Sequence, residues 1–244
     1  MTHRRIVALA LSVIGLLATG CGAAPPTAAP SGQFIELPGI GSTRVDVPRP
    51  TSGGACTVAL PEGETIGQRV AALREIGLFA DRPDQSNEDV ISDVDARLEE
   101  TFGGTLTADD PYLDLIVASM DVSRVWWGDL EADVGAENQV YAATLEEWAA
   151  ISEGAFDPQA IEERWASGSG PVTISYAVDG QAVELAPDYL EDWIDPRILT
   201  SVNEQIADSG RQFELFQAFD QSAFVMALTG SERTALVARG WCFE

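Results

Sequence analysis

The chain contains no lysine, and its single histidine is His3. Without lysine there is no Schiff-base amine, no Ser-Lys general base and no P-loop cation. If the first residues are removed, as argued below, the mature chain also lacks an imidazole. Ser-His-Asp and Cys-His catalysis and histidine-ligated zinc, copper or haem sites are then excluded. These absences remove most enzyme chemistries, and we expect no cofactor.

Basic residues are also scarce, because 14 arginines stand against 39 aspartates and glutamates, which gives a formal charge of −25. Arg4 and Arg5 lie in the first 20 residues, so a chain without that segment has 12 basic side chains and a charge of −27. Such a surface repels phosphate backbones and anionic lipid head groups. We therefore expect neither nucleic-acid binding nor electrostatic docking to a membrane.

Long apolar runs are absent apart from Ile6–Leu17, which follows a short basic start. This run is shorter than the roughly 20 residues of a membrane-spanning helix, but it fits the apolar core of a secretory signal. Together with Ala18–Cys21 it resembles the lipobox of bacterial lipoproteins, with Ala18 where leucine is usual. The resemblance implies that residues 1–20 are a signal peptide and that Cys21 is acylated, for example with palmitate. It also implies a cell-membrane location, lipid-anchored on the extracytoplasmic face; a soluble secreted form or a retained helix are the alternatives.

Residues 21–33 are rich in alanine and proline, which can neither bury a core nor continue a regular helix, so we expect a flexible tether. The remaining residues 34–244 have the length and apolar content of one sizeable domain or two small packed halves. We predict a single globular domain, with residues 34–60 as an arm lying across it.

Only three cysteines are present, at positions 21, 56 and 242. If Cys21 carries lipid, Cys56 and Cys242 form an even pair in an oxidising compartment, which favours a disulfide between them. The alternative is two buried free thiols.

Helical periodicity dominates the first half of the chain. Capped starts and apolar residues at helical spacing predict four helices: Thr65 to about Phe79, 86–102, a short one from 110, and 138–152.

The second half changes to a two-residue period. Val172–Val178 and Gln181–Leu185 flank Asp179-Gly180, a pair typical of tight β-hairpin turns. Further strands are expected at 212–217 and 223–228, and helices from Asp195-Pro196 to Gly210 and at 231–239. The predicted fold is α+β, a helical first half packed on a mainly antiparallel sheet of about four strands.

An acidic stretch offers a candidate metal site. Asp129, Glu131 and Asp133 follow a tryptophan pair and could supply oxygen ligands to Ca²⁺. The spacing fails the EF-hand pattern, because Val134 and Val140 stand where glycine and glutamate are required. A strand with one solvated face, followed by an acidic helix start, explains the same residues.

Two further functions are suggested by the residue types present, namely sugar binding by tryptophans and hydrolysis by paired carboxylates. Trp126 and Trp127 could form a platform for sugar, but neighbouring residues of a strand face opposite ways, so we expect at least one in the core. Paired carboxylates, as in glycoside hydrolases, are the one general acid-base chemistry that the composition allows. With so many acidic residues, no particular pair stands out.

Four stretches of the chain resemble a family of uncharacterised bacterial proteins with no assigned activity. They are Trp127–Val134, Asn138–Tyr141, Gly170–Thr173 and Phe219–Phe224. The resemblance implies a defined fold and no mechanism. We predict a non-enzymatic surface lipoprotein, an acidic module that binds an extracellular protein, a glycan or a cation. The alternative is a carboxylate-dependent hydrolase acting on cell-wall glycan.

Overall fold

The computed structural model describes residues 63–105, 107, 108, 110, 112–217 and 221–243. The expected signal peptide and tether lie outside these residues. The described helices are α1 (Ile66–Ile76), α2 (Asn87–Phe102), α3 (Leu113–Ala118), α4 (Val140–Ile151), α5 (Ile198–Gln205), the 3₁₀ turn η1 (Ala207–Ser209) and α6 (Gly230–Ala238). The described strands are β1 (Val125–Asp129), β2 (Gln159–Trp165), β3 (Val172–Val178), β4 (Gln181–Leu185), β5 (Arg211–Gln217) and β6 (Ser222–Thr229).

The first two helices start where the sequence predicts them to. Thr65 and Gln68 form a capping box at α1, and Ser86 and Asp89 form another at α2. Each box satisfies two backbone N–H groups that a helix start leaves without partners. Helix α1 ends earlier than predicted because Gly77 adopts a left-handed φ of 117°.

A three-stranded antiparallel sheet, in the order β1-β6-β5, runs through the middle of the fold. Trp126 and Trp127 of β1 point to opposite faces, as predicted, and each packs against a different hydrophobic cluster. Trp127 stacks on Phe224 with ring centroids 5.3 Å apart. Gly128 makes room for the indole of Trp126, since a Cβ there would lie 2.1 Å from the ring.

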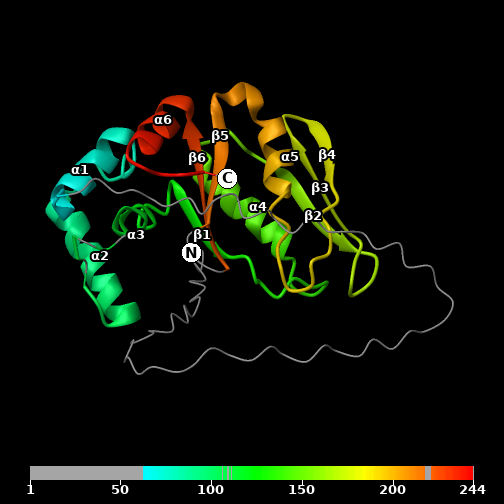
Figure 1. The fold of residues 1–244 in the computed structure, drawn as a ribbon. Coiled ribbons are helices and arrows are strands. Elements are labelled where there is room, and N and C mark those ends of the chain that lie inside the picture. The colour runs from blue at the N-terminus through cyan, green and yellow to red at the C-terminus, as the bar shows by residue number, and fades with distance from the viewer. Residues whose placement is uncertain (1–62, 106, 109, 111, 218–220, 244) are drawn as a thin grey trace, which may run out of the picture. The chain divides into compact units, whose positions relative to one another are not determined.

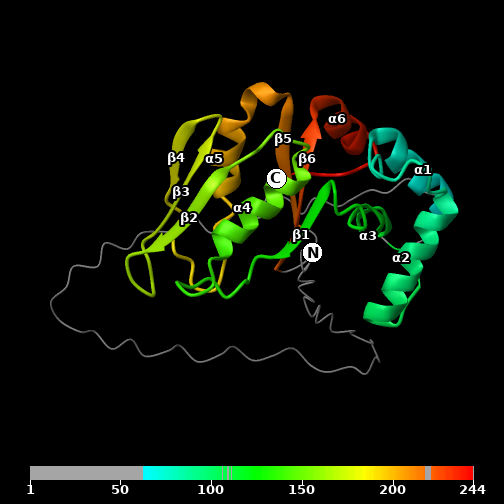
Figure 2. The ribbon, with the colours of Figure 1, turned by 180° about the vertical axis from the view of Figure 1, so that it is seen from behind.

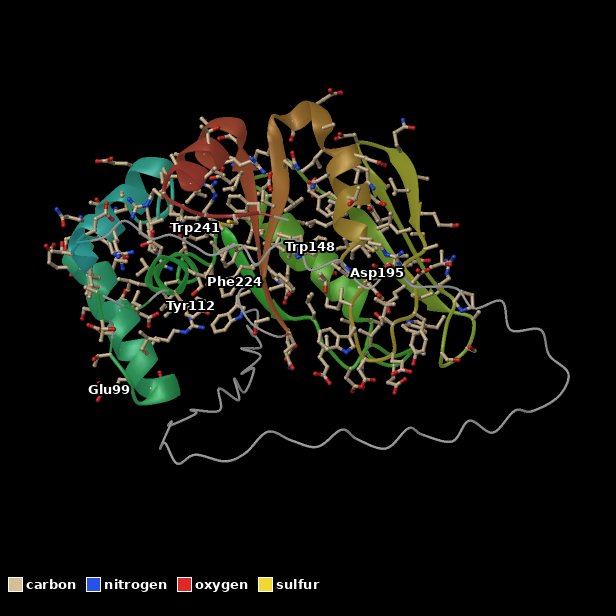
Figure 3. All side chains as sticks on the ribbon, viewed as in Figure 1. Glu99, Tyr112, Trp148, Asp195, Phe224 and Trp241 are labelled. Atoms are coloured by element: carbon tan, nitrogen blue, oxygen red, sulfur yellow. The ribbon has the colours of Figure 1, made fainter. Side chains whose placement is uncertain are left out.

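The two faces of this central sheet carry separate hydrophobic cores. Helices α1, α2, α3 and α6 cover one face, whereas α4, α5 and the sheet β2-β3-β4 lie on the other, as Figures 1 and 2 show from opposite sides. Figure 3 places Phe224 and Trp241 in the first core and Trp148 in the second. Strand β6 is buried along almost its whole length because both faces are covered.

The second sheet has the order β2-β3-β4 and is antiparallel throughout. Its β3–β4 hairpin turns at Asp179 and Gly180, whose φ angles of 51° and 75° are both positive, as the predicted turn requires. Every second residue of β3 is buried against the core. Strand β2 was not predicted, because charged residues at 162–164 and a bulge at Ala160 interrupt its two-residue pattern.

The α+β class is confirmed, but the expected arrangement of strands differs from the observed one. The described strands form two three-stranded sheets rather than one sheet of about four. The first half is not purely helical either, because β1 pairs with β6 from the far end of the chain. This long-range pairing leaves no local mark in the sequence.

Charged side chains are buried on the helical side of the central sheet. Arg69 and Asp114 are 4% and 1% exposed and form an ion pair at 3.0 Å, and Arg239 reaches the same carboxylate at 3.1 Å. Arg124 pairs with Glu232 at 2.9 Å between the ends of α1 and α6. The Arg69–Asp114 pair joins α1 to α3, and Arg124, in the turn before β1, links Glu232 of α6 to the Gly77 carbonyl at the end of α1. Among the described helices, none is both long and apolar enough to cross a membrane.

Candidate functional site

Three loops gather at one end of the fold, beside the start of α4, and we call this surface the loop end. It comprises residues 129–138, 166–171 and 186–197, which Figures 1 and 2 show below α4 and β2. In these three segments Arg197 is the only basic residue, against eight carboxylates. The loop end is therefore strongly acidic.

The acidic stretch of β1 is completed by a segment that is remote in the sequence. Glu131 lies opposite Trp193 in an antiparallel bridge. The N–H of Ile194 donates to the carbonyl of Leu130 at 2.8 Å, and the N–H of Ala132 donates to that of Asp192 at 2.9 Å. Hydrogen bonds that flank a bridge in this way bring the two opposed side chains close together. An indole that is 36% exposed thus stands beside a carboxylate.

Of the three carboxylates proposed from the sequence as metal ligands, Asp129 and Asp133 accept hydrogen bonds within the protein. Asp129 accepts hydrogen bonds from the N–H of Glu131 and from Gln221 Nε2, both at 2.9 Å. Asp133 adopts a φ of 51° and accepts from Asn138 Nδ2 at 3.2 Å. Among the described residues, no three His, Cys, Asp or Glu side chains form a group able to hold a metal ion. The structure thus places these carboxylates in one segment but does not gather them.

Asp195 is the most constrained carboxylate of the loop end, and Figure 3 labels it on the α4 side of the central sheet. It is 2% exposed. It accepts from Arg197 Nε and Nη2, both at 2.8 Å, and from the N–H groups of Asp188 and Arg197. Burial acts to raise the pKa of Asp195, but these hydrogen bonds outweigh it and hold the pKa below its usual value of 3.8.

Arg197 links the buried Asp195 to the protein surface. Its side chain is 63% exposed and also binds Asp188, which is 67% exposed. Hydrogen bonds to Asp195 and Asp188 raise the pKa of Arg197 above its ordinary value. Both carboxylates are therefore held by one permanent cation.

Tyr141 of α4 supports Asp195 from inside the core. Its hydroxyl accepts a hydrogen bond from the N–H of Asp195 at 3.0 Å. Burial raises the pKa of Tyr141 to about 12, so the phenol is neutral at physiological pH. It cannot act as a general base there.

An aromatic pair borders the loop end, formed by Trp165 at the end of β2 and Tyr189. The ring of Trp165 meets that of Tyr189 edge to face at 5.9 Å, and Tyr189 is 38% exposed. Glu163 accepts from the Trp165 indole at 2.7 Å and from the N–H of Ala142 at 3.0 Å. Because Gln139 gives α4 no side-chain cap, this carboxylate from β2 stabilises the helix start. It thereby ties the second sheet to α4.

A cavity of about 480 Å³ lies elsewhere, between α5 and β5. Leu199 and Phe213 form its apolar part, and Glu204 is the one carboxylate among the residues that line it. Hydrolysis of a glycosidic bond by the usual mechanism needs two carboxyl groups facing each other. This cavity does not supply that pair.

The predicted covalent sites cannot be placed on this surface. Cys21 and Cys56 lie outside the described residues, whereas Cys242 lies in the segment that follows α6. Acylation of Cys21 and the Cys56–Cys242 bridge therefore stay predictions.

Comparison of the chain with protein-family models, with curated proteins and with solved structures finds no match. Any function must therefore be argued from the chemistry of the sites themselves.

The sequence showed only part of the loop end. A helix was expected to begin at Asp195-Pro196, but α5 begins at Ile198, with Arg197 as its N-cap and no side-chain cap. Asp195 accepts from the N–H of Arg197 just before this helix. Its capture of the Arg197 side chain was missed, as was the pairing of Glu131 with Trp193. The Asp195–Arg197 spacing of two residues was the one available signal, since the partners Asp188 and Glu131 come from other positions along the chain.

Proposed function

We propose that the protein is a non-enzymatic lipoprotein of the cell surface, whose loop end binds a positively charged segment of another protein. Acylation of Cys21 would anchor it on the extracytoplasmic face of the membrane, and a Cys56–Cys242 disulfide would close the globular domain. The loop end has eight carboxylates and a single arginine, and this negative charge favours a positively charged partner.

The proposal depends most on the way that Asp195 and Asp188 share Arg197. A general acid in a glycosidase needs a carboxyl group whose pKa is raised, so that it keeps a proton at neutral pH. Asp195 has the opposite property, because its pKa is lowered. Asp195 is therefore held as an anion by Arg197 and does not donate a proton, and recognition is left to the exposed carboxylates of the loop end such as Glu131.

The exposed aromatic ring adds a second means of recognition. Trp193 presents its indole beside Glu131, and a guanidinium or ammonium group is attracted both to an aromatic face and to a carboxylate. The high negative charge of the chain would also speed encounter with a basic partner and slow it for an anionic one. We therefore favour a basic protein segment over an uncharged glycan.

The test is a pulldown from native cell envelope with the full mature protein as bait. We expect bound proteins to elute as the salt concentration rises, and the double variant Glu131→Gln with Trp193→Ala to lose them. Glu162→Gln with Glu184→Gln is the control, because it changes charge on the outer face of the second sheet. Equal capture by all three proteins would refute the loop end as the binding surface.

Membrane attachment is tested separately. Cys21→Ala should move the protein from the membrane fraction to the medium or leave it unprocessed, because the acyl chains are the predicted anchor. Unchanged membrane retention of a processed variant would refute the anchor without affecting the binding surface.

A further inference from the structure

Strand β4 forms the outer edge of the second sheet. The strand order is β2-β3-β4, and Figures 1 and 2 show β4 at the margin of the fold in two opposite views. Among the described elements, β3 is the only one that packs closely against β4. Ala182 and Glu184 are exposed, whereas Val183 is half-buried. Solvent therefore reaches the side of β4 that faces away from β3.

The register of the hairpin shows which backbone groups face this edge. In a β-turn the carbonyl of the first residue bonds the N–H of the fourth, so Val178 and Gln181 form a hydrogen-bonded pair. Bonded pairs recur at every second residue of an antiparallel ladder. Ala182 and Glu184 lie between the bonded positions, so they turn their N–H and C=O groups away from β3.

Hydrogen bonds on the other side of β3 give the same result. The N–H of Ala166 donates to the Pro171 carbonyl at 3.0 Å, which continues the β2–β3 ladder and makes Ser175 a bonded partner of β2. Ser175 lies opposite Glu184, and a residue whose backbone bonds β2 does not also bond β4. The outward backbone groups of Ala182 and Glu184 make no hydrogen bond with any described residue.

The edge of β5 in the central sheet is different, because a side chain already occupies it. Asn203 of α5 donates to the Phe213 carbonyl at 2.8 Å and accepts from the Phe213 N–H at 2.7 Å. A carboxamide has the same donor and acceptor as a peptide group, so Asn203 takes the place of a neighbouring strand. At β4 only the short length of the strand and the charge of Glu184 oppose pairing with another chain.

The charge around β4 determines which kind of segment can pair with it. Residues 179–192 contain five carboxylates and no basic residue. A second copy of this chain would bring the same carboxylates to the edge, and two chains with a formal charge of −25 repel each other. A segment that contains lysine or arginine is attracted instead. Its apolar side chains would lie next to Val183, on the half-buried face of the strand.

We propose that the edge of β4 binds an extended, basic segment of a partner protein, which adds to the second sheet as a fourth, antiparallel strand. The peptide groups of Ala182 and Glu184 gain hydrogen-bond partners, and apolar side chains of the segment cover Val183. Directly opposed residues of an antiparallel pair share one face, so the basic side chains lie opposite Ala182 and Glu184. This edge uses no residue of the loop end, so the proposal does not depend on the proposed function.

The probe is an acetylated, amidated hexapeptide of alternating lysine and valine, titrated into the full mature protein and followed by NMR of the backbone amides. The amide signals of Ala182 and Glu184 should shift. Methylating the lysine backbone nitrogens should weaken binding at least about tenfold, because in this pairing the lysine N–H groups face β4. Methylating the valine nitrogens, which face away, should leave the affinity within about twofold. Any other order of the two methylated peptides would overturn the proposal.

Two comparisons test the charge and the location of binding. A hexapeptide of alternating glutamate and valine should bind at least about tenfold more weakly than the lysine peptide, and equal affinity would refute the basic partner. The double variant Glu131→Gln with Trp193→Ala should bind the lysine peptide as the wild type does. Loss of binding in this variant would place the peptide at the loop end, which would overturn this proposal and not the proposed function.

Proline at the edge provides a matched pair of variants. Ala182→Pro removes an N–H that does not bond β3, which edge strands tolerate, and it should abolish binding of the lysine peptide. Ala182→Thr keeps the N–H and suits an exposed strand position, so it should bind as the wild type does. Unchanged binding by Ala182→Pro would contradict strand addition.

The state of the free protein tests the other possible occupants of the edge. A dimer that Ala182→Pro disrupts would assign the edge to a second copy and would overturn the proposal. Protection of the Ala182 and Glu184 amides from hydrogen exchange in the free monomer would assign the edge to another part of the same chain, with the same consequence. The comparison of methylated peptides uses the unmodified protein, so it decides the question even if Ala182→Pro does not fold.

Discussion

The helical side of the central sheet and the loop end use the same residue types for different purposes. On the helical side, Arg69 and Asp114 are almost completely buried and join α1 to α3. At the loop end, Arg197 and Asp188 are mostly exposed, and only Asp195 is buried beneath them. A buried ion pair must keep both partners, whereas an exposed one contributes little to folding and is available for recognition. Burial, rather than residue type, therefore separates the structural charges from the candidate binding charges.

The largest effect should come from breaking the buried pair. Asp114→Asn leaves the guanidinium groups of Arg69 and Arg239 without this carboxylate, and we expect a loss of about 3 to 5 kcal/mol in the free energy of unfolding. Urea denaturation measures it. Glu162→Gln is the control, since its pair with Arg164 is exposed and should matter by at most about 1 kcal/mol. Similar losses for the two variants would remove the distinction between the two regions.

Local signals explain how much of the fold could be predicted. Capping boxes and the Asp179-Gly180 turn specify contacts between near neighbours, so the helices and the hairpin were found. The single four-stranded sheet was wrong although the sequence held a clue. Residues 223–228 form an unbroken apolar run, typical of burial on both faces, whereas β3 alternates as a strand buried on one face does. The two patterns indicate that β6 lies in a sheet covered on both faces and β3 in a sheet covered on one.

The candidate site was less predictable because its members meet only through the tertiary fold. The acidic character of 129–133 was visible, but its partner Trp193 lies some 60 residues further along the chain. Strand β5 was expected, but its sequence did not indicate that the Asn203 side chain would bond the backbone of Phe213.

A smaller effect is expected in the core next to the loop end. Gly128→Ala would force a methyl group into the Trp126 indole, and we expect a loss of about 1 to 3 kcal/mol through overpacking. Gly67→Ala in α1 is the matched control, because open space surrounds that glycine and alanine favours the helix. Denaturant unfolding followed by tryptophan fluorescence measures both. A neutral Gly128→Ala would mean that the Trp126 ring is not held against the β1 backbone.

The link between β2 and α4 should contribute less again. Glu163→Gln keeps the shape of the side chain but removes a negative charge from the start of α4, which we expect to cost about 0.3 to 1 kcal/mol. Faster amide hydrogen exchange in the first turn of α4 should accompany the loss. Glu146→Gln, on the exposed face of the same helix, should leave this exchange unchanged. If it also speeds exchange, the effect comes from the overall charge near α4 and not from the Glu163 contact.

The smallest effect concerns acid stability. The pKa of Asp195 is lowered in the folded protein, so its contribution to stability is fully present above the unfolded value of about 3.9 and is lost as the pH falls through the lower folded value. Arg197→Gln should therefore be less stable than the wild type at neutral pH, and the difference should shrink below about pH 4. Urea midpoints measured from pH 2 to 7 provide the comparison. A difference that grows on acidification would be the wrong sign.

The central claim is that the loop end holds fixed anions for binding rather than an acid for catalysis. Carbon-13 NMR of the Asp195 carboxyl carbon, followed as a function of pH in the full mature protein, tests it most directly. We predict a titration midpoint below the ordinary aspartate value of 3.8, moving upward in Arg197→Gln. A wild-type midpoint above about 5, as a proton-donating carboxyl group requires, would contradict the account and favour the hydrolase.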